Sequence, residues 1–365
     1  MIEILIWAGF FVLILFFIAL DLGVFHRRPH AIRIREALGW TVLWIVAALV
    51  FNVAVYFFYE HHWMVWGESP PPDAGWEAAI QFFTAYLVEK SLSVDNIFVI
   101  AVIFAFFRVP AALQHRVLFW GILGAVVLRG IMIAAGTVMI HYLDWVTYIF
   151  GALLLYSAYR MAFMGDEDVD PSKNRLVRLA RRFFPVVTEF QGQRFFVKRD
   201  GRWAMTPLFL ALLVVESSDV MFAVDSIPAV LAVTRDPFIV FTSNVFAILG
   251  LRSLYFAVAG LMELFEHLRA SLVVLLAYIG VKMLLAHHFP IPNYISLLVI
   301  GSILGVGVVA SIISMALKPK PPAKTQPINP MVEPDNSGVG LEAASAVERR
   351  WEHDLADQSV NEPHS

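Results

Sequence analysis

Five acidic residues lie inside stretches of sequence that are otherwise strongly apolar. Glu89 and Asp95 belong to the segment EKSLSVDN, and Glu216, Asp219 and Asp225 belong to the segment ESSDVMFAVDSIPAV. A carboxylate at the centre of a bilayer costs about 2.5–3.5 kcal/mol on insertion scales. Acids kept at that cost typically mark an ion or proton pathway, and the alternative is a network of internal salt bridges that joins helices.

The polar residues around these acids carry hard oxygen donors, among them Asn96 and Ser226. Such oxygens suit Mg²⁺, Ca²⁺ or Mn²⁺, whereas Zn²⁺ and Cu favour His or Cys. The chain has no cysteine, and its 11 histidines fall in loops, in the tail or at the ends of apolar stretches. The residues therefore predict a site for a hard divalent cation, without selecting among the three.

Helix geometry limits which acids can share one site. Glu89 and Asp95 are about 240° apart around a regular helix, and Glu216 and Asp225 are about 180° apart. One hypothesis is that both stretches form broken helices, as in many transporters. The alternative is that only Asp95 and Asp225 face a cavity, while the other acids pair with buried cations. The cations available for such pairs are Lys90, Arg129 and Arg252.

The composition predicts an all-α polytopic membrane protein. Of 365 residues, 59% are hydrophobic and 16% charged, with a mean hydropathy of +0.70, whereas soluble domains carry about 25% charged residues. Apolar runs of about 18 or more residues recur, and in hydrocarbon these must be helical. The nine predicted spans are residues 2–25, 37–59, 77–107, 117–140, 145–164, 204–233, 238–260, 270–287 and 293–317.

The distribution of basic residues predicts the orientation. With the N-terminus outside, 21 of the 27 Lys and Arg residues fall in inside loops, one in an outside loop and five within spans. The positive-inside rule therefore favours an N-out, C-in topology. The largest inside loop, 165–203, is either a solvated linker or carries an amphipathic helix near the lipid surface. The Pro-rich, polar segment 318–365 is predicted to be a disordered cytoplasmic tail.

The sequence also contains an internal repeat. Spans three to five match spans six to eight, and because three spans separate the copies, the second copy is predicted to be inverted. Secondary transporters commonly bind substrate where such halves meet. The predicted transmembrane domain, 1–317, thus holds repeat A (77–164) and repeat B (204–287), flanked by spans one, two and nine. The matched pairs are Glu89 with Asp219, Asp95 with Asp225, Arg129 with Arg252, and Arg160 with Lys282.

Four stretches resemble the TerC family of integral membrane proteins, most closely its Alx-type members. They are LDLGVFHR (20–27), EKSLSVDNIFV (89–99), ESSDVMFAVDSIPA (216–229) and FTSNVFAILGLRSLYF (241–256), and the resemblance covers residues 1–317. It implies export of Mn²⁺, a link to tellurium resistance and an association with alkaline pH. It also implies that the five acids bind metal, and it makes Asn244 a candidate neutral ligand.

The residues and the resemblance together predict a multi-pass exporter of Mn²⁺ in the cytoplasmic (inner) membrane. Burial disfavours the charged form of a carboxylate, so exchange of metal for protons is expected. Asp95 and Asp225 are the predicted central ligands. Glu89, Glu216 and Asp219 are predicted to be second ligands or proton carriers. The predicted supporting residues are Asn96, Ser226, Asn244, Lys90, Arg129 and Arg252.

Other function classes are less well supported. The chain contains no H-E-x-x-H or G-x-S-x-G motif, so we expect it not to be an enzyme. No prosthetic cofactor and no nucleic-acid partner is expected; the expected partners are membrane lipid, the metal ion and protons. The main rival hypothesis is a membrane scaffold in an envelope-stress or tellurite-resistance complex, in which loop 165–203 recruits cytoplasmic partners.

Overall fold

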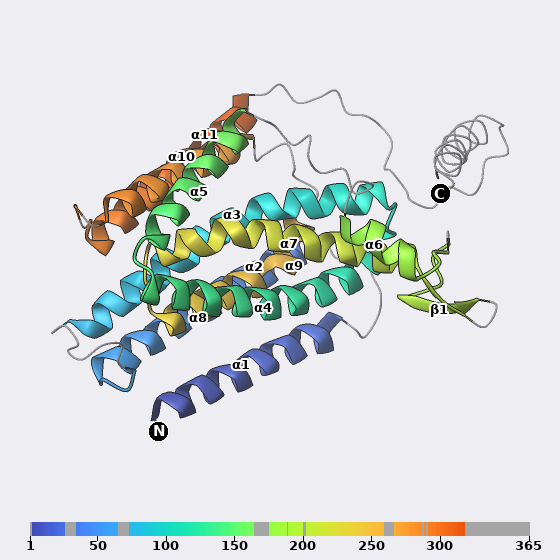
Figure 1. Cartoon of the computed structure of the whole chain (residues 1–365), viewed down its shortest axis with the longest axis horizontal. Helices are drawn as coiled ribbons and strands as arrows, with labels where there is room; N and C mark the ends of the chain where they lie inside the picture. Colours follow the sequence, from blue (N-terminus) through green and yellow to red (C-terminus); the bar gives the residue numbers. More distant parts are fainter. Residues whose placement is uncertain are drawn as a thin grey trace, which may run out of the picture. The chain divides into compact units, whose positions relative to one another are not determined.

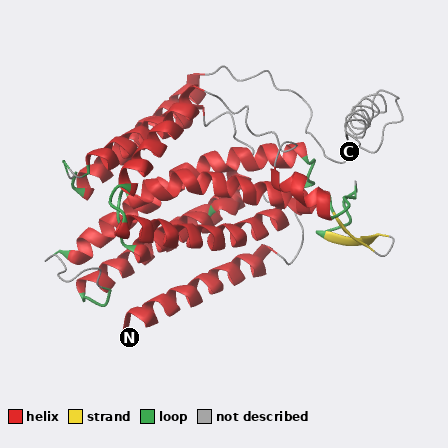
Figure 2. Cartoon of the chain, in the orientation of Figure 1, coloured by secondary structure: helices red, strands yellow, loops and turns green. Residues whose placement is uncertain are grey.

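The structure is a computed structural model, and it describes residues 2–25, 34–64, 73–163, 175–187, 189–199, 202–258, 266–286, 288–289 and 291–317. Over these residues the chain is mainly helical, with one short hairpin (Figure 1, Figure 2). The predicted tail 318–365 lies outside the described residues. The elements are α1 (Ile2–Phe25), α2 (Ile34–Glu60), α3 (Ala74–Phe106), α4 (Ala111–Tyr142), α5 (Val146–Phe163), α6 (Arg175–Phe183), β1 (Phe196–Arg199), β2 (Arg202–Met205), α7 (Pro207–Leu231), α8 (Pro237–Leu249), α9 (Leu251–Val258), α10 (Glu266–Leu285) and α11 (Asn293–Leu317).

The all-α polytopic class is confirmed. Within the described chain, seven helical segments are long and apolar enough to cross a membrane, with α8 and α9 acting together as one. The other six are α1, α2, α4, α5, α7 and α11. Helix α3 is longer than any of these but carries Glu77, Glu89, Lys90 and Asp95. Every predicted span has a helix at its position, whereas the number of spans and their orientation stay predictions.

The hypothesis of broken helices in spans three and six is wrong. Helix α3 runs without interruption for 33 residues, and α7 passes through Pro228 without ending there. The break lies instead in span seven, which divides at Gly250 into α8 and α9. Side chains of other helices bind three of these acids, Glu89, Asp219 and Asp225, without any unwinding of the α3 or α7 backbone.

The helix packing matches what a two-fold repeat requires. Helix α3 packs against α7, α5 packs along α10, and the packing of α4 on α7 has its counterpart in that of α8 on α3. At the α5–α10 contact, a Cβ at Gly151 would lie 3.1 Å from the carbonyl oxygen of Gly280, and the reverse distance is 3.0 Å. Small residues of this kind let membrane helices approach closely.

An aromatic core joins the first two helices to α3 and α8. Phe51 of α2 lies 4.7 Å from Phe246 of α8 and 5.6 Å from Phe82 of α3, measured between ring centroids. Phe10 of α1 packs on the same group, 5.4 Å from Phe51. This core holds α8 so tightly that nearly all of its side chains are buried, which matters because α8 borders the polar cluster described below.

The described part of loop 165–203, residues 175–187, 189–199 and 202–203, carries more secondary structure than the linker hypothesis predicts. Its residues include α6 and most of an antiparallel hairpin in which Phe196 pairs with Met205 and Arg199 with Arg202. The alternative prediction of a helix in this loop is therefore confirmed by α6, while its contact with lipid stays a prediction. Arg116 of α4 donates a 3.0 Å hydrogen bond to Gln193, which ties the segment to the bundle.

Candidate functional site

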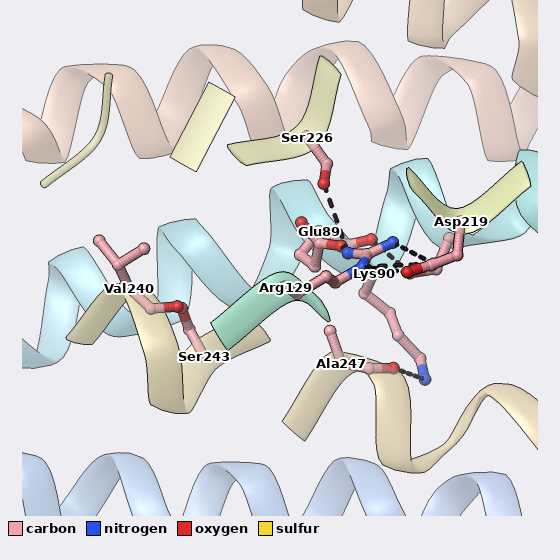
Figure 3. Close-up of polar contacts among 9 residues, drawn as sticks. Glu89, Lys90, Arg129, Asp219, Ser226, Val240, Ser243 and Ala247 are labelled. Carbon is pink, nitrogen blue, oxygen red and sulfur yellow. Dashed lines mark hydrogen bonds and ion pairs between the residues drawn. The ribbon is translucent and has the colours of Figure 1, made fainter. Parts of the chain in front are cut away.

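Arg129 of α4 joins acidic side chains of two other helices. Its Nη1 contacts Oε1 of Glu89 on α3, and its Nη2 lies 2.9 Å from Oδ1 of Asp219 on α7 (Figure 3). Its Nε donates to the Asp219 carboxylate at 3.2–3.3 Å, and Nη1 donates to Oγ of Ser226 at 3.3 Å. Arg129 and Glu89 are 1% and 0% exposed. A buried charge requires such partners, so the cluster binds α3, α4 and α7 together.

Glu216 lies beside this cluster, pressed against α4. A Cβ at Gly124 would overlap its carboxyl group, so the observed position of this group requires glycine at 124. Oε2 of Glu216 is buried and has no hydrogen-bond partner among the described residues, and the same holds for Oε2 of Glu89. Buried polar atoms are rarely left in this state. These two oxygens are therefore the atoms of the cluster with capacity to accept a cation or a proton.

Lys90 makes a different contact from the one expected. Its Nζ donates a 3.2 Å hydrogen bond to the backbone carbonyl of Ala247 in the last turn of α8 (Figure 3). A Cβ at Gly250 would lie 2.7 Å from this Nζ. Because a cation is favourable at a helix C-terminus, Lys90 stabilises the end of α8 at the point where the helix breaks.

Asp225 is held by α5 rather than by the Arg129 cluster. Its Oδ1 accepts a 2.5 Å hydrogen bond from Oγ of Ser157, and the charge of Arg160 also acts on it. Asp95 is partly buried on α3 and is likewise engaged with a neighbouring group. Across the described ranges, no group of three or more Asp, Glu or His side chains is arranged to hold a metal ion. The predicted five-acid centre is thus not assembled in this arrangement.

The remaining predicted residues are buried around the same helices. Asn96 and Arg252 are 5% and 2% exposed. Asn244 is 1% exposed, and neither of its amide atoms has a hydrogen-bond partner within the described part of the chain. Phe241, one turn before Asn244 on α8, packs on Gly130 next to Arg129. Because residues three apart share a helix face, Asn244 belongs to the face of α8 that meets α4.

Sequence reasoning missed three groups of the site: the Ser157 hydroxyl, the space at Gly124 and the Ala247 carbonyl. The repeat contained a signal for the first, because extending the match of Arg160 with Lys282 places Ile279 opposite Ser157. A polar residue such as Ser157 that is matched by an apolar residue such as Ile279 indicates a polar contact that only one copy of the repeat makes. A backbone carbonyl acting as a partner leaves no such signal.

A second buried acid lies at the start of α8, outside the apolar span. Asp236 caps this helix, accepting hydrogen bonds from the backbone N–H groups of Phe238 and Ile239 at 2.8 and 3.1 Å. Its other oxygen accepts a 2.6 Å bond from the Tyr59 hydroxyl of α2. Burial raises the pKa of the Asp236 carboxyl group, although these hydrogen bonds oppose the shift.

Comparisons with known proteins place these residues in a family. Residues 74–320 match the model of the integral membrane protein TerC family. The chain is 48% identical over 308 residues to the "Uncharacterized membrane protein STKORF319" of Myxococcus xanthus, which covers 84% of this chain and 92% of that protein. It is 44% identical over 311 residues to the "Putative membrane-bound redox modulator Alx" of Escherichia coli K12, covering 85% and 94%. No solved structure matches. The chain belongs to the TerC family of integral membrane proteins.

Proposed function

We propose that the chain exports a hard divalent cation across the cytoplasmic membrane, with Mn²⁺ as the cargo. The observation that carries the proposal is the Arg129 cluster. Glu89 and Asp219 occupy matched positions of the two repeats, yet both bind one buried guanidinium. An internal cation between such acids neutralises them when no cargo is present, and an arriving cation competes with it for the same oxygens.

The choice of cargo rests on donor chemistry and on the resemblance of the motifs to manganese exporters. Carboxylate, hydroxyl and amide oxygens surround the cluster, and these suit Mn²⁺, Mg²⁺ and Ca²⁺. The name of the Escherichia coli relative suggests a redox role instead. Because this chain has no cysteine, a redox role would not proceed through thiol–disulfide exchange of its own side chains.

The test is the manganese content of bacterial cells whose only manganese exporter is this chain. During manganese excess, cells carrying Asp95→Asn with Asp225→Asn should hold severalfold more Mn than wild type, and Glu89→Gln with Asp219→Asn should act alike. Asp73→Asn is the control, because Asp73 is exposed and makes no side-chain cap to α3. Equal Mn content in the wild type and both double variants would end the proposal.

The secondary structure in the described part of loop 165–203 is the observation that favours the scaffold alternative. A neutral linker in place of these residues separates the two functions, because the acids of the bundle are untouched. Export should survive the exchange, whereas a scaffold that recruits partners through α6 and the hairpin should lose its function in stress resistance.

A further inference from the structure

The exposed side of α6 combines apolar and basic side chains. Val177 is 2% exposed and faces the bundle, whereas Leu176 and Leu179 are 46% and 53% exposed. The helix therefore has one apolar face directed toward protein and a second one directed outward. Arg178 and Arg182 are exposed on the same short helix, which is the composition of helices that lie in a membrane interface.

The hairpin divides its side chains in the same way. Val197 and Ala204 face each other across the strands and are buried with Val187. The opposite face carries Trp203, which is 56% exposed, with Nζ of Lys198 lying 5.8 Å from its ring centroid. A large exposed aromatic ring beside a basic side chain is typical of residues at the level of lipid headgroups.

An aromatic row connects α6, the hairpin and α7. Phe184, directly after α6, lies 6.3 Å from Phe196 of β1, and Phe196 lies 4.4 Å from Phe209 in the first turn of α7. Phe184 and Phe196 are 43% and 37% exposed. Helix α7 is apolar enough to cross a membrane, and the row ends in its first turn.

We propose that α6 and the hairpin form a platform that lies on the membrane and binds anionic lipid headgroups. The apolar side chains enter the boundary between headgroups and acyl chains, while the basic ones bind phosphates. The predicted orientation places this segment at the cytoplasmic leaflet, which carries the anionic lipids. Continuity with α7 favours lipid over a soluble partner. The apolar residues are Leu176, Leu179, Phe184, Phe196 and Trp203; the basic residues are Arg178, Arg182, Lys198, Arg199 and Arg202.

The absence of native cysteine permits a direct test on the full-length chain. Single cysteines replace Leu179, Trp203 and the exposed acidic Glu189, and each carries one spin label in lipid nanodiscs. Collision with oxygen, which concentrates in lipid, is compared with collision with a water-soluble nickel chelate. The oxygen-to-nickel ratio at positions 179 and 203 should be severalfold higher than at 189, and should rise when phosphatidylglycerol is added to phosphatidylcholine.

Charge removal distinguishes headgroup binding from simple apolar contact. Arg178→Gln with Arg182→Gln should weaken the response to phosphatidylglycerol, and raising salt in the unsubstituted chain should weaken it in the same direction through screening. The salt series does not depend on the variant folding. Equal ratios at 179, 203 and 189 in anionic nanodiscs would overturn the platform. So would protection from nickel that arises only when cytoplasmic proteins are added. Neither readout involves transport, so the outcome is independent of the export proposal.

Discussion

The two halves of the bundle use their buried arginines differently. Arg129 lies in the middle of the continuous helix α4 and binds both Glu89 and Asp219. Its counterpart, Arg252, is equally buried but lies in the first turn of α9, after the break at Gly250. One half thus supplies the cation for matched acids of both halves. Two copies of a repeated sequence can therefore fold into one asymmetric polar site.

The matched helix crossings differ in charge as well. Where α4 meets α7, the space at Gly124 holds the Glu216 carboxyl group. In the repeat, Gly124 corresponds to Ala247, where α8 meets α3, and there the carbonyl accepts the Lys90 ammonium. One crossing therefore buries an acid and the other a base, so the halves contribute different chemistry from the same framework.

Removal of the shared arginine should have the largest effect. Arg129→Gln leaves Glu89 and Asp219 buried without their cation, and breaking such a pair costs about 3–5 kcal/mol. We expect a large fall in the midpoint of denaturant unfolding in detergent. Combining Arg129→Gln with Glu89→Gln and Asp219→Asn should recover part of the loss. The same two acid substitutions should not rescue Arg252→Gln, because both acids bind Arg129. Equal rescue of Arg252→Gln would contradict the asymmetry.

Loss of the Ser157 hydroxyl should rank next. Ser157→Ala removes the 2.5 Å hydrogen bond to Asp225, and a hydrogen bond to a charged group contributes about 1.5–3 kcal/mol. Ser93→Ala is the matched control, because the Ser93 hydroxyl only bonds the Glu89 carbonyl of its own helix. The same unfolding measurement should separate the two, and indistinguishable midpoints would show that Asp225 does not depend on α5.

Gly124→Ala places at the α4–α7 crossing the residue type that Ala247 provides at the matched α8–α3 crossing. The new methyl group displaces the Glu216 carboxyl group, and because this group is the end of a flexible side chain, we expect a cost near the lower end of the range of about 1–3 kcal/mol for overpacking. Gly301→Ala in α11 is the control, since a Cβ there meets no atom within 4 Å. Adding Glu216→Ala to Gly124→Ala should relieve the clash and raise the unfolding midpoint. A midpoint for Gly124→Ala no lower than that of Gly301→Ala would refute this account.

The smallest expected effect concerns the starts of the matched helices. The N-cap residue of α4 is Pro110, which provides no side-chain cap, whereas the N-cap residue of α8 is Asp236, whose side chain caps the helix. Burial, with a further contribution from Glu3, raises the pKa of Asp236. Its contribution to stability is therefore complete below the unfolded value of about 3.9 and is lost as pH rises through the higher folded value.

Denaturant unfolding midpoints, measured as the pH rises from the unfolded pKa of Asp236 through its folded pKa, check this pH dependence of stability. The wild type should lose stability relative to Asp236→Asn as pH rises, because the amide still caps α8 but does not titrate. Parallel pH profiles for the two proteins would show that the raised pKa has no influence on folding.

Long-range features of the fold were predictable because hydropathy and helix length determine them. Each predicted span has its helix, and the hypothesis that acids pair with cations of neighbouring helices holds for Arg129 with Glu89 and Asp219. The sequence could not show that Arg129, rather than Arg252, takes both acids, because LRG and LRS are nearly identical contexts. The hairpin was missed because strands of four residues are too short to produce a clear alternation.

The unbroken course of α3 and α7 has a mechanical consequence. At a rise of 1.5 Å per residue, Glu89 and Asp95 stand about 9 Å apart along one rigid rod, and Glu216 and Asp225 stand about 14 Å apart along the other. Neither rod unwinds between its acids, so they travel together. A slide of α7 that loosens Asp219 from Arg129 must also pull Asp225 along Ser157, and events at these two acids are thereby synchronised.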